Sequence, residues 1–138
     1  MMPDLENAKA LLRSGIFTCV LCQGSQIRTC MDQGVQPLVR LLDEGSFRGF
    51  SAADKVVGKA TAFLYVLLGV EAVYTPVASE GAIQILTQHV IPLFYVLAVP
   101  AIFNRSRTGY CPMETAVRDI NDPQQAYAAI VDTLAKMR

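Results

Sequence analysis

The chain has 138 residues, about the length of one ordinary domain, and 52% of them are hydrophobic while 17% are charged. A domain of this size can fold on its hydrophobic core without a disulfide or a structural metal. Twelve basic and twelve acidic residues cancel, so the composition does not support nucleic-acid binding through phosphate neutralisation. The apolar excess predicts a sheet buried on both faces or a large oligomer interface.

No segment has the properties of a signal peptide or a membrane span. The N-terminal segment around Asp4 is acidic and amphipathic, unlike a signal peptide. The longest apolar run, Val90–Phe103, is shorter than a membrane span and is interrupted by Pro92 and Pro100. We therefore expect a cytoplasmic protein with no membrane partner and with one domain over residues 1–138.

Hydrophobic periodicity and turn residues divide the chain into helices and strands. Helices are predicted over residues 3–13, 35–44, 51–68, 79–89, 111–118 and 123–137, and strands over residues 16–22, 26–30, 70–75 and 93–97. The third helix is predicted to begin at Ser51 because Asp54 follows three residues later, as in a capping box. Pro76 is predicted to end the third strand. A hairpin followed by strand–helix units predicts a mixed sheet covered on both faces, with a fifth strand that the pattern does not place.

The spacing of Cys19 and Cys22 is that of a C-x-x-C motif, which is typical of redox or zinc sites. Both residues lie in a predicted strand, where side chains three positions apart point to opposite faces. The two thiols therefore cannot easily meet. We interpret them as buried free cysteines in a reducing compartment.

Two sequence blocks resemble a known family. They are Gly49–Ala60 (GFSAADKVVGKA) and Gly109–Glu114 (GYCPME), and the similarity extends through Thr18–Leu21 and Tyr74–Pro76. The chain resembles a small bacterial family of unknown function with a cytidine deaminase-like fold. This resemblance covers most of the chain and implies a three-layer α/β/α sandwich with a mixed sheet.

Active deaminases hold zinc with a His or Cys on one helix and two Cys at the start of another, and a nearby Glu moves protons. Three ligands leave one position for an activated water. Here the segment Ser51–Lys55 contains no His or Cys, and Glu114 stands where the second Cys of the other helix would be. The pattern therefore argues against zinc-dependent deamination, and we expect no cofactor.

Three residues are candidate catalytic groups: Cys111, Asp54 and Lys55. A thiol at a helix N-terminus has a stabilised thiolate, so Cys111 is a candidate nucleophile or redox-sensitive group. Asp54 could line the pocket as a base or ligand, or simply cap its predicted helix. Lys55 could pair with Asp54 or bind a ligand phosphate. The alternative interpretation is that Lys55 is an ordinary solvated surface residue.

Four further residues are candidate ligand-binding groups: Ser51, Arg105, Arg107 and Glu114. Arg105 and Arg107 lie in a polar loop that leads into a helix N-terminus, which is a natural anion site. Arginine can also bind phosphate or carboxylate through two parallel hydrogen bonds. Glu114 follows Cys111 by three residues, as a capping residue would, and Ser51 has the simpler interpretation of a helix cap.

Three classes of function remain open. The first is a binding protein that holds a nucleotide or similar small anionic ligand without zinc chemistry. The second is a non-classical enzyme that uses Cys111, Asp54 and Lys55, or that binds an unusual metal with Glu114. The third is a self-associating structural or regulatory protein. The resemblance implies a homo-oligomer, because deaminase relatives commonly form dimers or tetramers, and the apolar surplus agrees with this.

Overall fold

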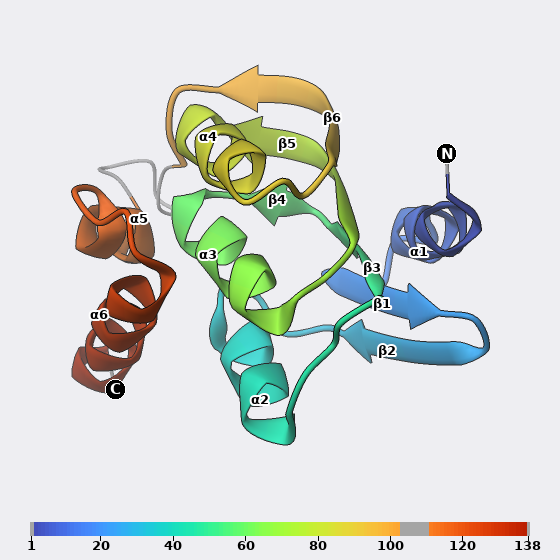
Figure 1. Cartoon of the computed structure of the whole chain (residues 1–138), viewed down its shortest axis with the longest axis horizontal. Coiled ribbons are helices and arrows are strands. Elements are labelled where there is room, and N and C mark those ends of the chain that lie inside the picture. The colour runs from blue at the N-terminus through green and yellow to red at the C-terminus, as the bar shows by residue number, and fades with distance from the viewer. Residues whose placement is uncertain (1, 103–110, 138) are drawn as a thin grey trace.

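The computed structural model of the chain describes residues 2–102 and 111–137 (Figure 1). Within these ranges the chain forms six helices and a six-stranded mixed sheet. The helices are α1 (Pro3–Arg13), α2 (Gln36–Glu44), α3 (Lys59–Leu68), α4 (Glu80–Gln88), α5 (Pro112–Val117) and α6 (Pro123–Lys136). The strands are β1 (Cys19–Gln23), β2 (Gln26–Cys30), β3 (Ser51–Asp54), β4 (Val56–Val57), β5 (Ala72–Ser79) and β6 (Leu93–Val99).

The sheet combines an antiparallel half with a parallel half. The strand order is β2-β1-β3-β5-β4, and β6 pairs with β5 as well. β1 runs antiparallel to β2 and β3, whereas β3, β4 and β6 all run parallel to β5. Ser51 pairs with Ala72 and Val56 pairs with Val77, so β3 and β4 keep one register against β5. They are therefore one strand path that is interrupted at Lys55.

Two apolar clusters cover the two faces of the sheet. On one face α1 contributes Leu5, Ala8 and Leu12, which pack with strand residues including Val20 and Cys22. On the other face a larger cluster joins the sheet to α2, α3, α4, α5 and α6. Figure 1 shows α1 on the side of the sheet away from α5 and α6. The prediction of a sheet buried on both faces is thus confirmed for its central strands.

The predicted helix over residues 51–68 is wrong in its first half. Residues 51–57 form β3 and β4, and α3 begins only at Lys59. Ser51, Ala52 and Ala53 are completely buried, because β3 lies between β1 and β5 in the centre of the sheet. Ser51 is therefore not a helix cap. β3 is therefore the fifth strand that the sequence pattern predicts but does not locate.

Local signals elsewhere agree with the structure. The Ser79 side chain accepts a hydrogen bond from the Ala82 N–H at 3.1 Å at the start of α4. The Asp122 side chain accepts one from the Gln125 N–H at 2.9 Å at the start of α6. Both residues are therefore N-caps of the helices that follow them. The predicted end of a strand at Pro76 is wrong, since β5 continues to Ser79.

The two cysteines of the C-x-x-C motif lie on opposite faces, as the strand alternation predicts. Cys22 packs in the α1 cluster, and Cys19 packs in the cluster on the other face. Both are buried free thiols. The C-x-x-C motif therefore does not form a redox or zinc site.

β6 is the strand at one edge of the sheet and its apolar side chains are exposed. Val96 is 75% exposed and Leu97 is 54% exposed, although α4 packs against part of β6. α1 lies over β1, β3 and β5, so it does not reach this edge. No helix formed by the described residues is long and apolar enough to span a membrane.

Candidate functional site

A cavity of about 390 Å³ opens where the sheet meets the starts of α2, α3 and α5. Its wall is formed by the turn before α2 (Asp32–Val35), the break between β3 and β4 (Asp54–Val56), the first turn of α3 and the start of α5. This volume is in the range of small-molecule sites. The cavity therefore lies where three helix starts converge on one end of the sheet.

Asp54 is the most unusual polar residue in this wall. It ends β3, and its Oδ2 accepts a hydrogen bond from the Tyr65 hydroxyl at 2.6 Å, while the Val56 N–H lies 3.4 Å from its Oδ1. Burial raises the pKa of Asp54 from 3.8 to about 6, although the hydrogen bonds from Tyr65 and from backbone N–H groups lower it. A carboxyl group that titrates near neutral pH is a common feature of functional sites.

Asp54 belongs to a row of polar and sulfur-containing side chains on one sheet face. Cys19 on β1 is the register partner of Asp54 on β3 and of Cys30 on β2. Tyr65 reaches this row from α3 and is fully buried. Burial and the Asp54 charge raise the pKa of Tyr65 well above its ordinary value, so the tyrosine stays a hydrogen-bond donor.

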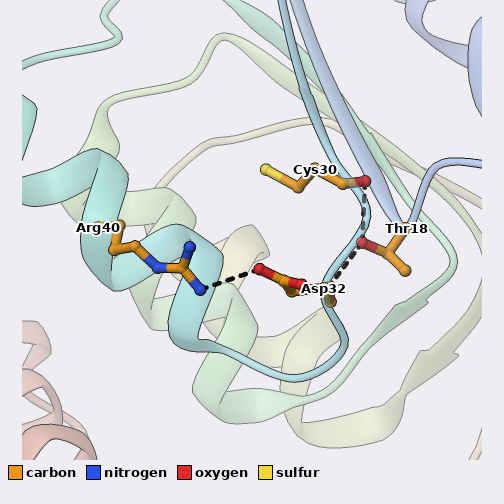
Figure 2. A network of polar contacts seen from close by, with 4 residues as sticks. All are labelled: Thr18, Cys30, Asp32 and Arg40. Atoms are coloured by element: carbon orange, nitrogen blue, oxygen red, sulfur yellow. Dashed lines mark hydrogen bonds and ion pairs between the residues drawn. The ribbon is translucent and has the colours of Figure 1, made fainter.

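The turn before α2 is fixed by polar contacts on both sides (Figure 2). The Thr18 hydroxyl lies 2.8 Å from the Asp32 carbonyl oxygen and 3.1 Å from the Cys30 carbonyl oxygen. The Asp32 carboxylate forms an ion pair with Arg40 on α2 at 3.0 Å. These contacts hold Asp32 and its neighbours as one wall of the cavity.

Glu114 caps a helix, but not the one that the sequence pattern indicates. Its Oε1 accepts a hydrogen bond from the Lys59 N–H and its Oε2 accepts one from the Ala60 N–H, each at 2.9 Å. These are free N–H groups at the start of α3, where the helix dipole favours a carboxylate. Glu114 therefore ties α5 to α3, and both carboxylate oxygens are engaged in doing so.

Gly58 makes this contact possible. It is the N-cap of α3 and contributes no capping side chain. A Cβ atom placed on Gly58 would lie 2.6 Å from the Glu114 Oε1, which is closer than real Cβ atoms approach. The glycine therefore leaves room for Glu114 to act as the capping group from another helix.

The other predicted catalytic residues also reach the cavity. Lys55 and Cys111 line it together with Asp54 and Glu114. The Lys55 side chain is exposed, and its Nζ lies 3.5 Å from the Gly15 carbonyl oxygen. Cys111 is half-buried at the N-cap of α5, which has only six residues. Four of the seven predicted site residues are thus brought together.

The remaining predicted site residues do not add to this wall. Ser51 is buried in β3 and lies outside the cavity lining, and its Oγ has no hydrogen-bond partner among the described residues. Arg105 and Arg107 lie outside the described residues. In the part of the chain that the structure describes, no three His, Cys, Asp or Glu side chains form a group able to hold a metal ion.

Sequence reasoning missed three parts of the site. In the sequence pattern, Tyr65 is indistinguishable from the apolar residues of a buried helix. Cys19 is likewise indistinguishable from an ordinary core thiol. Asp32 reads as a turn residue. Their roles depend on strand register and on contacts between distant segments, and only the strand alternation around Cys19 gave a usable signal.

The comparisons with known proteins agree on the fold. The family model described as a domain of unknown function (DUF1893) matches residues 7–134. A crystal structure of a DUF1893 family protein (TM1506) from Thermotoga maritima superposes with a TM-score of 0.86 at 22% sequence identity. That similarity covers 99% of this chain and 92% of the other. No curated protein matches the chain significantly.

Proposed function

Since the chain belongs to the DUF1893 family of domains of unknown function, we propose its function from its own geometry. The protein binds a small molecule in the cavity, with a hydrogen-bond-donating group of the ligand against Asp54. The observation that carries this proposal is the half-buried carboxyl group of Asp54, with its raised pKa, in the wall of a cavity of about 390 Å³. A carboxylate has about four acceptor positions, and the Tyr65 hydroxyl and the Val56 N–H use two of them.

The charges of the cavity define the class of ligand. Asp32 is an exposed carboxylate paired with Arg40, and both Glu114 oxygens are used to cap α3. Asp54 is the half-buried carboxylate of the wall that neither an ion pair nor helix capping engages. A ligand phosphate would be repelled by Asp54 and could lie only at the rim near the exposed Lys55. A nucleotide or similar anionic ligand therefore fits in one orientation, with its nitrogenous end inward.

We extend the proposal to the fold relationship that the sequence resemblance implies. In support, the order of the strand paths is β2-β1-β3/β4-β5-β6, with an antiparallel hairpin beside parallel strands. Helices on both faces support a three-layer α/β/α sandwich. The cavity lies at helix starts, as the zinc site of deaminases does, which supports a deaminase-like arrangement.

The proposal includes no zinc step. The residues at the start of α2 are Val35, Gln36 and Pro37, and those at the start of α3 are Gly58 and Lys59. None of these side chains is a usual zinc ligand. The N–H groups at the start of α3 are also already capped by Glu114. The third helix start, that of α5, adds one thiol from Cys111. Since no three His, Cys, Asp or Glu side chains of the described residues form a metal-holding group, the donor set does not fit zinc.

One observation favours an enzyme as the second candidate. The pKa of Asp54, about 6, lies near neutral pH, where a carboxyl group can accept and return a proton. Cys111 lines the same cavity and could act as a nucleophile on a bound substrate. In this case Asp54→Asn and Cys111→Ala each abolish turnover without unfolding the protein.

Thermal stabilisation by matched nucleoside probes tests the binding proposal. Cytidine and uridine differ in an amino group against a carbonyl group, and their monophosphates add an anionic group to each. We expect cytidine to raise Tm in a concentration-dependent way and to bind about tenfold tighter than uridine. The cytidine amino group can donate freely to Asp54, whereas the single ring N–H of uridine lies between two carbonyl oxygens that the Asp54 carboxylate repels. Stabilisation that is equal for cytidine and uridine, or absent for all four probes, contradicts the proposal.

A further inference from the structure

Cys19 and Cys30 face each other across the β1–β2 hairpin. They are register partners on adjacent antiparallel strands, so both side chains lie on the same sheet face. Partners of this kind have Cα atoms about 4.5–5.5 Å apart, within the range of about 4.4–6.8 Å that disulfides span. The hairpin therefore already holds the two cysteines at a separation that a disulfide can bridge.

The environments of the two thiols differ in a way that gives them different roles. Cys19 is 4% exposed, whereas Cys30 is half-buried at the end of β2. The hydrogen bond between the thiols, burial and the Asp54 charge raise the pKa of Cys19. The same hydrogen bond lowers the pKa of Cys30, with help from the charges of Arg28 and Arg40. Cys30 is thus the more accessible and more acidic thiol of the pair.

We propose that Cys19 and Cys30 are a reversible redox pair that forms a disulfide within one chain when the protein meets a peroxide. The Cys30 thiolate attacks one peroxide oxygen, an S–O bond forms and the O–O bond breaks, and the departing hydroxide takes a proton to become water. Cys19 then attacks the Cys30 sulfur, the S–S bond forms and a second water leaves. Two thiols are oxidised and one hydrogen peroxide is reduced to two waters.

The position of the pair makes the reaction reversible and places it beside the cavity. Cys30 is exposed enough for a small thiol reductant to reach the bond, and exposed disulfides are the labile ones. Cys19 lines the cavity next to Asp54. Oxidation therefore changes the wall of the cavity. The effect on ligand binding rests on the proposed function, whereas formation of the bond does not.

The full chain and cysteine variants test the proposal with hydrogen peroxide as the oxidant. A variant with Cys22→Ser and Cys111→Ser keeps only the pair. We expect its intact mass to fall by two hydrogen atoms, with both thiols lost to a thiol reagent and restored by dithiothreitol. In the reduced wild type, iodoacetamide should label Cys30 at least about tenfold faster than Cys22, which is buried on the other face and has a raised pKa.

Cys30→Ser in the same background is the matched control, and it should form no bond within the chain. The proposal is overturned if the pair-only variant keeps both thiols, gains oxygen atoms instead of losing hydrogens, or links two molecules together. If the variant does not fold, a peptide map of oxidised wild type decides the matter, with a Cys19–Cys30 linked peptide as the expected product and any other linkage as the contradiction. If nucleoside binding is unchanged after oxidation, the proposed effect of the disulfide on ligand binding is wrong. The proposal that Cys19 and Cys30 form a redox pair is then unaffected.

Discussion

Tyr65 on α3 donates its hydroxyl hydrogen to the Oδ2 of Asp54 over 2.6 Å, and this bond joins the largest fully buried side chain of the described residues to the cavity wall. The bond fixes one carboxylate oxygen of Asp54. It also links the orientation of the candidate ligand-binding group to the packing of the central helix. This fixed orientation allows Asp54 to select a ligand, which a freely rotating carboxylate would not do.

Tyr65→Phe removes the hydrogen bond and keeps the ring. Hydrogen bonds to charged groups contribute about 1.5–3 kcal/mol and neutral ones about 1 kcal/mol. We therefore expect the free energy of unfolding to fall more at pH 8, where Asp54 is ionised, than at pH 4.5, where it is protonated. Urea denaturation at the two pH values measures this, and Tyr127→Phe on α6 is the control. Equal losses at both pH values would contradict the role of Tyr65.

Asp54 makes stability depend on pH in a defined direction. Its pKa is about 6 in the folded protein and 3.8 in an unperturbed group, so the folded state binds the proton more tightly. Its contribution is complete below pH 3.8 and is lost as the pH rises through about 6, by about 3 kcal/mol. Asp54→Asn should lack this fall in denaturation experiments from pH 4 to pH 7. Asp119→Asn, at an exposed position, should keep it.

The contact between Glu114 and α3 can be measured with a double-mutant cycle. Glu114→Ala removes the cap and should cost about 1–2 kcal/mol. Gly58→Ala should cost a similar amount, since its Cβ would lie 2.6 Å from the Glu114 Oε1. In the Glu114→Ala background the Gly58 substitution should cost only a few tenths of a kcal/mol, because the clash is gone. Additive losses in urea denaturation would show that the two residues act independently.

The expectation of a homo-oligomer remains a prediction, and β6 is the surface on which it can be tested. Edge strands of monomers usually carry charged residues that block pairing, but residues 90–102 contain none. Val96→Lys, at a position that is 75% exposed, should therefore weaken self-association in sedimentation velocity with little loss of stability. Val131→Lys on α6 is the control. A wild type that is monomeric at every concentration would refute the expectation.

The elements that sequence reasoning located are those with local signals. α1 has an apolar face of period 3.6, and α4 and α6 each follow a residue whose side chain caps the helix. Residues 51–57 have no such signal, because small residues in a strand buried on both faces do not alternate in polarity. The Ser51–Asp54 spacing then favoured a helix. Pairing with β1 and β5 makes these residues strands instead of a helix.

The site could be predicted in part for a similar reason. The two sequence blocks that carry the family resemblance contribute Asp54, Lys55, Cys111 and Glu114 to one cavity. The hydrogen bond of Tyr65 could not be predicted, because its partner lies on a strand that the pattern assigned to a helix. The role of Glu114 as the cap of α3 joins residues more than fifty positions apart, which spacing alone does not reveal.

The most direct test of the central claim is a titration of cytidine into the wild type, Asp54→Asn and Asp119→Asn by calorimetry at pH 7.5. Asp54 is then ionised and accepts the ligand amino group, whereas an asparagine side chain offers fewer acceptor positions. We predict saturable binding to the wild type and to Asp119→Asn, with an affinity at least about tenfold lower for Asp54→Asn. Equal affinity for all three proteins, or no binding to the wild type, would contradict the claim that Asp54 anchors a small ligand in this cavity.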